Sequence, residues 1–175
     1  MRLQSGFRAG LLLCLLFCLA GCTKREMDFS HPDVDLFVKQ LKEGTYRTTN
    51  ERGVIEVPRF ARSQIPELLD YAGDLTRVPF FPTVYNTKHG RLRLGECMLW
   101  IIERIRQGKD PSQGFRLVRE EAESYEPAYF LTDDELLDAV GYYRRWWDNR
   151  VLPRTLWITD PCYDNPLCGS GYRWW

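Results

Sequence analysis

Residues 92–107 are apolar around most of the circumference of a helix drawn through them. One broad side of that helix carries Leu94, Cys97, Met98, Ile101, Ile102 and Ile105, and Leu99 and Trp100 widen it. A helix with so wide an apolar face is stable only when several neighbours cover it. Gly108, Asp110 and Pro111 predict its end. The sequence therefore predicts a fold built around one central helix.

Three further segments each carry a single apolar stripe at helical spacing. The stripes are Val34, Phe37, Val38 and Leu41 in 30–44; Ile65, Leu68, Leu69 and Ala72 in 63–73; and Leu136, Leu137, Val140, Tyr143 and Trp147 in 132–150. Ser30 and Pro32 predict the start of the first helix, and Gly44 its end. Thr132 and Glu135 match the capping box that opens the last one.

The connections between these segments are long for an ideal bundle. Residues 115–123 predict a short additional helix, and 54–57 a small strand. The predicted fold is an all-α domain of four to five irregularly packed helices with at most a short β-hairpin. An aromatic-rich tail follows, so 30–175 form a single domain.

The chain carries no excess of positive charge. After position 21 it has 22 basic and 24 acidic side chains, a net charge of about −2. Proteins that bind nucleic acid draw most of their affinity from basic side chains on phosphates. We therefore expect no nucleic-acid partner.

The N-terminus has the pattern of an export signal. Arg2 and Arg8 precede an apolar run over 9–20, which is too short for a membrane-spanning helix and typical of a cleaved signal peptide. The run ends in Leu19-Ala20-Gly21-Cys22. An ordinary signal peptide or a degenerate anchor helix, with a chance cysteine, is the alternative.

These four residues resemble the lipobox of bacterial lipoproteins, and the chain is similar to single-domain lipoproteins of Bacteroides and its relatives. The resemblance implies cleavage after residue 21, lipidation of Cys22 with fatty acyl chains such as palmitate, and anchoring to the bilayer through a tether over 22–29. No Asp follows at the second mature position, which for such lipoproteins implies the outer membrane. The resemblance is compatible with a domain on the periplasmic side of that membrane and with one on the cell surface.

Three cysteines remain beyond Cys22. Cys162 and Cys168 flank a turn-forming segment, and an exported protein can join them in a disulfide. A metal site that includes Asp160 and Asp164 is the less favoured alternative, because the spacing matches no zinc pattern. Cys97 lies on the apolar side of the central helix and is interpreted as a buried thiol rather than a nucleophile.

Glu96 and Glu103 lie two turns apart on one face of the central helix. They are interpreted as part of a solvated stripe that pairs with Arg104 or Arg106. The alternative is an acid and base pair of a glycan hydrolase, which requires both carboxyl groups to face one cleft. They are weak catalytic candidates. The sequence contains no phosphate-binding loop, dinucleotide fingerprint, zinc-protease motif or nucleophile elbow, and we expect no cofactor and no metal.

Aromatic residues gather near the C-terminus, with Trp146-Trp147 in the last helix and Trp174-Trp175 in the tail. Such rings pack a core, bind a partner or glycan, or sit at a membrane interface. Core packing is the favoured interpretation, and Trp146, Trp174 and Trp175 are the candidate binding residues. The sequence thus predicts a lipid-anchored envelope binding or scaffold protein whose partner is an envelope protein or glycan. Its alternative is an envelope glycan hydrolase.

Overall fold

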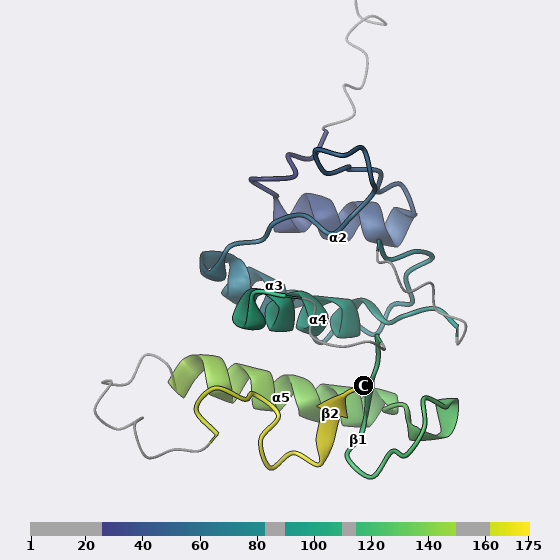
Figure 1. Ribbon diagram of the computed structural model, residues 1–175, viewed down its shortest axis with the longest axis vertical. Helices are drawn as coiled ribbons and strands as arrows, with labels where there is room; N and C mark the ends of the chain where they lie inside the picture. The colour runs from purple at the N-terminus through teal and green to yellow at the C-terminus, as the bar shows by residue number, and fades with distance from the viewer. Residues whose placement is uncertain (1–25, 83–89, 110–114, 150–161) are drawn as a thin grey trace, which may run out of the picture.

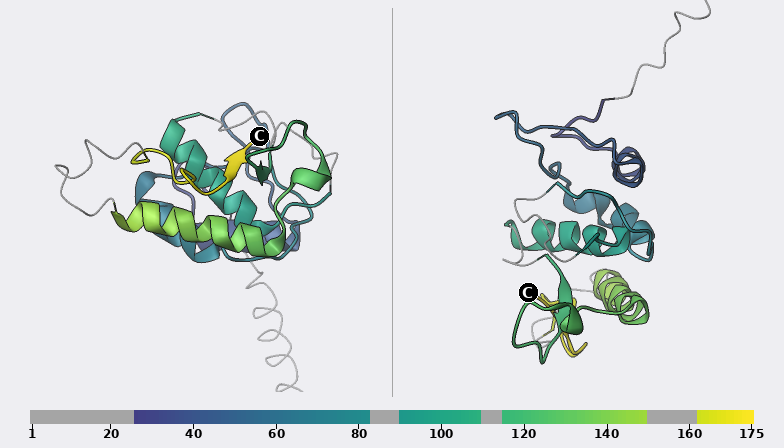
Figure 2. Two further views of the ribbon diagram at one scale, coloured as in Figure 1. Left: turned by 90° about the horizontal axis from the view of Figure 1, so that it is seen from below. Right: turned by 90° about the vertical axis from the view of Figure 1, so that its right-hand side faces the viewer.

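The computed structural model describes residues 26–82, 90–109, 115–149 and 162–175. Within them, four α-helices lie in three layers along the long axis of the molecule (Figure 1). The first layer holds α2 (Val34–Glu43), the second α3 (Ile65–Tyr71) and α4 (Leu94–Gln107), and the third α5 (Asp133–Asn149) with a small sheet. The right-hand view of Figure 2 shows the same layers from the side. The expected mostly helical fold is confirmed.

The central helix of the prediction is α4. It contacts α2, α3 and α5, and every residue from Leu94 to Glu103 is buried. Gly95 lies where α4 crosses the end of α3. A Cβ built at this position would stand 2.0 Å from the Ala72 carbonyl oxygen, so no larger residue fits there. The prediction of one central helix covered by several neighbours is confirmed. The close approach of α4 to the end of α3 requires glycine at position 95.

The stripes predicted for α2 and α3 are buried as expected. Helix α2 ends at Gly44, which adopts the left-handed conformation with φ 66°. Its start differs from the prediction: the Asp33 carboxylate accepts the Leu36 N–H and caps the helix, so Ser30 and Pro32 precede it. A 3₁₀ turn, η1 (Arg62–Gln64), leads into α3.

Helix α5 begins with the predicted capping box, in which the Thr132 hydroxyl accepts the Glu135 N–H and the Glu135 carboxylate accepts the Thr132 N–H. Its buried face is turned slightly from the predicted one. Trp146 is buried while Trp147 is half-buried, and Leu137 is 43% exposed. The reason is that the Trp146 indole points at the C-terminal segment, where its N–H donates to the Tyr163 backbone carbonyl.

The prediction of a helix over 115–123 is wrong. This segment contains β1 (Leu117–Arg119), which pairs antiparallel with β2 (Tyr172–Trp174). Successive side chains of a strand point to opposite faces, so Leu117 enters the main core and Val118 a second cluster with Ala122 and Phe130. A short turn, η2 (Pro127–Tyr129), follows. The strand expected at 54–57 is reduced to an isolated bridge between Thr49 and Ile55.

Among the described residues, no helix has both the length and the apolar character needed to cross a bilayer.

Candidate functional site

A surface pocket of about 230 Å³ lies between the last turns of α5 and the cysteine loop, residues 162–168. We call it the aromatic pocket. Helix α5 contributes Tyr142, Arg145, Trp146 and Asn149, and the loop contributes Cys162, Tyr163, Asn165, Pro166 and Cys168. The four helical residues are spaced i, i+3, i+4 and i+7, which places them on one face of α5.

The loop side of the aromatic pocket is held by covalent and hydrogen bonds. Cys162 and Cys168 form a disulfide, and between them the Asn165 side-chain oxygen accepts the Leu167 N–H at 3.1 Å. The Trp146 indole N–H donates to the Tyr163 carbonyl at 3.1 Å, and an Arg106 guanidinium from α4 donates to the Asp164 carbonyl. The loop is therefore fixed to two helices.

Three polar side chains that line the aromatic pocket reach solvent. Arg145, Asn149 and Asn165 are exposed, and the Arg145 guanidinium lies 4.3 Å from the centre of the Tyr142 ring. Tyr142 and Tyr163 are half-buried, so part of each side chain reaches solvent. The pocket thus combines aromatic rings, two amides and a cation, which is a chemistry suited to a polar ligand with a flat apolar face.

Of the predicted binding residues, only Trp146 belongs to this pocket. Trp174 lies in β2, packs against the main core and donates its indole N–H to the Tyr143 hydroxyl at 2.8 Å. Trp175 packs beside Tyr125 and under the Arg173 guanidinium. The three tryptophans do not form one shared surface. The sequence analysis missed Tyr142, Arg145 and Asn149, although their helical spacing was available as a signal.

Glu96 is buried, and the predicted solvated stripe is wrong at this position. Only 1% of its side chain is exposed, and its carboxylate lies between the guanidinium groups of Arg93 at 3.4 Å and Arg116 at 3.2 Å. It also accepts the Leu117 backbone N–H at 3.0 Å. A carboxylate is tolerated in the interior because these donors replace its water. Its contacts join α4 to β1.

Glu103 is buried to the same extent, so the predicted solvated stripe is wrong here too, although the predicted ion pair with Arg106 is present. Arg106 donates to its Oε2 at 2.7 Å, Gln107 to the same oxygen at 2.9 Å, and the Tyr143 hydroxyl to Oε1 at 2.6 Å. Neither Glu103 nor Glu96 lines the aromatic pocket, the cavity lined by residues 26–29 and 45–49, or the cavity where residues 58–62 cross α4. Both carboxylates stabilise contacts between elements of the fold. They do not face any one of these three cavities together.

Cys97 is fully buried in α4. Burial raises the pKa of its thiol well above the ordinary value, and the neighbouring Glu96 carboxylate raises it further. A thiol held in the neutral form is a poor nucleophile and a poor metal ligand. Within the described ranges, no group of three or more His, Cys, Asp or Glu side chains could hold a metal ion.

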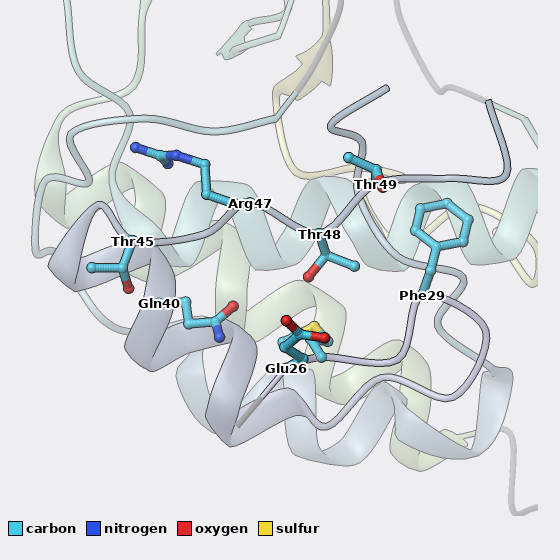
Figure 3. Close-up of a pocket in the computed structure, with 8 residues that line it drawn as sticks. Glu26, Phe29, Gln40, Thr45, Arg47, Thr48 and Thr49 are labelled. Atoms are coloured by element: carbon cyan, nitrogen blue, oxygen red, sulfur yellow. The ribbon is translucent and has the colours of Figure 1, made fainter. Parts of the chain in front are cut away.

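A second cavity, of about 390 Å³, is lined by residues of the segments 26–29 and 45–49 and by Gln40 of α2. Figure 3 shows that the side chains of Glu26, Gln40 and Thr48 point toward one another there, whereas the Arg47 guanidinium points away from this group. Arg47 instead donates to the Tyr46 carbonyl. The lining is polar and carries no aromatic platform apart from Phe29 at its edge. The cavity offers hydrogen-bond donors and acceptors, but only Phe29 provides a ring on which a ligand could stack.

A family profile described as a domain of unknown function, DUF4943, matches residues 28–175. The chain belongs to the DUF4943 family. No curated protein and no solved structure matches it. The DUF4943 match includes the four helices and two strands of the described residues, together with the cysteine loop.

Several predictions concern residues before or between the described parts of this DUF4943 protein. The signal peptide predicted over 1–21, Cys22 and most of the predicted tether lie outside the described residues, as does Asp160. Lipidation of Cys22 therefore stays a prediction.

Proposed function

We propose that this protein is a lipid-anchored component of the cell envelope that binds a glycan in the aromatic pocket. The observation that carries the proposal is the arrangement of Tyr142, Trp146 and Tyr163 beside the exposed amides of Asn149 and Asn165. The lipobox resemblance at Cys22 supports the envelope as the place where it acts.

The chemistry of the pocket fits a sugar ring. One face of a pyranose consists largely of C–H groups and stacks on an aromatic ring, while its hydroxyls exchange hydrogen bonds with amides. Arg145 adds a cation for an acidic or carboxyl-bearing sugar. The volume of about 230 Å³ is below the range of roughly 300–1,000 Å³ typical of drug-sized ligands. We therefore propose that one sugar unit or the end of a chain enters.

A rigid pocket favours binding because fewer side chains and loops are ordered when the ligand arrives. The disulfide and the Trp146 to Tyr163 hydrogen bond fix the loop before binding. The glycan hydrolase alternative requires a pair of carboxylates at the ligand, and none of the described residues that line the aromatic pocket is Asp or Glu. Binding without hydrolysis is thus the function that the site supports best.

The binding proposal is tested with the full chain purified from envelopes in neutral detergent. Muropeptides and oligosaccharides released from lipopolysaccharide serve as probes in isothermal titration calorimetry. Asn149→Ala should weaken binding of the recognised glycan by about tenfold, because it removes hydrogen bonds at the pocket. Asp148→Ala is the matched control, since Asp148 is exposed on the same helix turn but does not line the pocket. Equal affinity of the two variants, or no binding of either probe class, would contradict the proposal.

The anchor is tested separately by labelling growing cells with radioactive palmitate. The wild-type protein should carry the label and float with the outer membrane in a density gradient. Cys22→Ser should remove the label, because the thiol that accepts the lipid is lost. Cys18→Ser, a change in the apolar run before the cleavage site, should leave it. Label on the Cys22→Ser variant would show that Cys22 is not the lipidated residue.

A further inference from the structure

A third cavity, of about 390 Å³, lies where residues 58–62 cross the C-terminal half of α4. We call it the arginine cavity. Arg59, Arg62 and Arg104 contribute cationic side chains to its lining, and Phe60, Ile101 and Ile105 contribute apolar ones. Its volume lies within the range of roughly 300–1,000 Å³ that holds small molecules. It is distinct from the aromatic pocket, with which it shares no residue.

The arginine cavity carries an excess of positive charge. Arg104 is paired with Glu56 at 3.4 Å. Arg59 and Arg62 make no ion pair with any carboxylate in the part of the chain that the structure describes; instead, their guanidinium groups lie 5.8 Å from the centre of the Phe29 ring and 5.9 Å from that of Trp147. Stacking on a ring restrains a guanidinium without neutralising it. Two restrained cations thus remain for an anion.

The apolar side of the cavity restricts what that anion can be. Phe60, Ile101 and Ile105 line the cavity, and the partly buried Ile105 leaves apolar surface there that a hydrated inorganic ion would not cover. A ligand that satisfies both sides carries an oxyanion at one end and hydrocarbon next to it. Two N–H groups of an arginine guanidinium can donate in parallel to two oxygens of a carboxylate or phosphate.

We propose that the arginine cavity binds an amphiphilic oxyanion, a carboxylate or phosphate head attached to an apolar chain. The source is either the headgroup of a membrane lipid or a free fatty acid. The Arg59 N–H donates to the Phe29 carbonyl at 2.9 Å, and Phe29 is seven Cα-to-Cα steps from Cys22, a reach of at most about 25 Å. If Cys22 carries the lipid anchor of the proposed function, the cavity lies within that reach of the bilayer.

The experiment uses the full lipidated chain in nanodiscs of phosphatidylcholine. A palmitic acid with a photoreactive diazirine in its chain is added and activated by light, and the labelled peptides are identified by mass spectrometry. Adducts should concentrate within 58–62 and 101–108. The matching diazirine hexadecanol, which has the chain without the anion, should give about tenfold fewer adducts there, because it lacks charge-assisted hydrogen bonds to arginine.

Arg59→Ala combined with Arg62→Ala should reduce the acid's adducts to the level of the alcohol. Arg52→Ala is the matched control, since Arg52 is exposed and does not line the cavity. Thermal unfolding of both variants separates loss of binding from loss of fold. Equal labelling by acid and alcohol, or equal labelling of the two arginine variants, would overturn the proposal.

Two competitors identify the source of the ligand. Phosphatidylglycerol added to the nanodiscs should displace the acid if a membrane headgroup is the natural ligand, and should leave the labelling unchanged if a free fatty acid is. Inorganic phosphate should not compete, because it has no apolar chain; full displacement by phosphate alone would show that the apolar lining plays no part and would overturn the proposal. The glycan site does not enter this result, so the two proposals fail or stand separately.

Discussion

The Tyr143 hydroxyl donates a 2.6 Å hydrogen bond to the buried carboxylate of Glu103, and it accepts one of 2.8 Å from the Trp174 indole. This chain of two hydrogen bonds links β2, α5 and α4 through the interior. Burial and the nearby Glu103 carboxylate raise the pKa of Tyr143 well above its ordinary value. The hydroxyl therefore stays protonated and keeps its role as donor.

Tyr143→Phe should destabilise the protein by about 1–3 kcal/mol, because it removes one partner from the buried Glu103 carboxylate and one from the partly buried Trp174 indole. Chemical denaturation followed by circular dichroism measures the change. Tyr142→Phe is the matched control: its hydroxyl is near the surface and makes a long contact of 3.5 Å with the Gly169 carbonyl. It should change stability by less than about 0.5 kcal/mol. A loss of similar size in both variants would contradict the role of the buried chain.

Gly95→Ala should prevent the native packing of α4 on α3. The new Cβ would lie 2.0 Å from the Ala72 carbonyl oxygen, and a backbone atom cannot move aside as a side chain can. Gly141→Ala has the opposite expectation. The nearest atom to its Cβ is the end of the flexible Arg145 side chain at 3.4 Å, and alanine favours a helix interior over glycine by about 1 kcal/mol. Melting temperatures of the two variants should therefore move in opposite directions.

The disulfide should contribute about 2 kcal/mol, since it closes a short loop in the unfolded chain. Cys162→Ser combined with Cys168→Ser should lower the denaturation midpoint accordingly and weaken binding at the aromatic pocket. Dithiothreitol should lower the midpoint of the wild-type protein to that of the variant. The midpoint of the variant should not respond to the reductant; if it did, a different bond would be involved.

Acid should weaken the start of α5. Arg119 forms two hydrogen bonds with the Glu135 carboxylate, at 2.6 and 2.9 Å, and this guanidinium, with the Thr132 N–H, holds the pKa of Glu135 below its ordinary value of 4.5. A carboxyl whose pKa is lower in the folded state stabilises the protein above the unfolded pKa, and this contribution is lost as the pH falls through the folded value.

Glu135→Gln should consequently be less stable than the wild type near neutral pH, and the gap should narrow as the pH falls below 4.5. Urea denaturation at a series of pH values measures this gap. Glu123→Gln, at an exposed position, should follow the wild-type pH profile. A gap that stayed constant with pH would exclude an ionic contribution from Glu135.

Local patterns predicted the helices well, because their causes are local. Apolar spacing identified the buried stripes of α2 and α3, and the glycines at 44 and 108 both end helices with a left-handed backbone, at φ 66° and 68°. The capping box fixed the start of α5. Each of these signals acts within one or two turns of helix, so a single sequence displays it.

The start of α2 was missed for a local reason, because the Asp33 carboxylate caps it, but three other failures involve partners far apart in the sequence. Residues 117–119 become a strand because they pair with 172–174, and nothing near either segment marks the other. The acidic side chains of α4 are buried because Arg116 and Tyr143, 20 and 40 positions beyond Glu96 and Glu103, supply donors. The aromatic pocket likewise depends on the cysteine loop meeting one face of α5. Tertiary contact, rather than local propensity, decided each of these three cases.

The position of Glu96 between two guanidinium groups also bears on how this family can evolve. Loss of a single member would leave a buried charge without its counterpart and cost about 3–5 kcal/mol, whereas replacement of a whole buried ionic set by apolar side chains is often neutral. The positions of Glu96, Arg93 and Arg116 should therefore change together. Within DUF4943 we expect sequences that keep all three charges and sequences that have replaced all three, with intermediates rare.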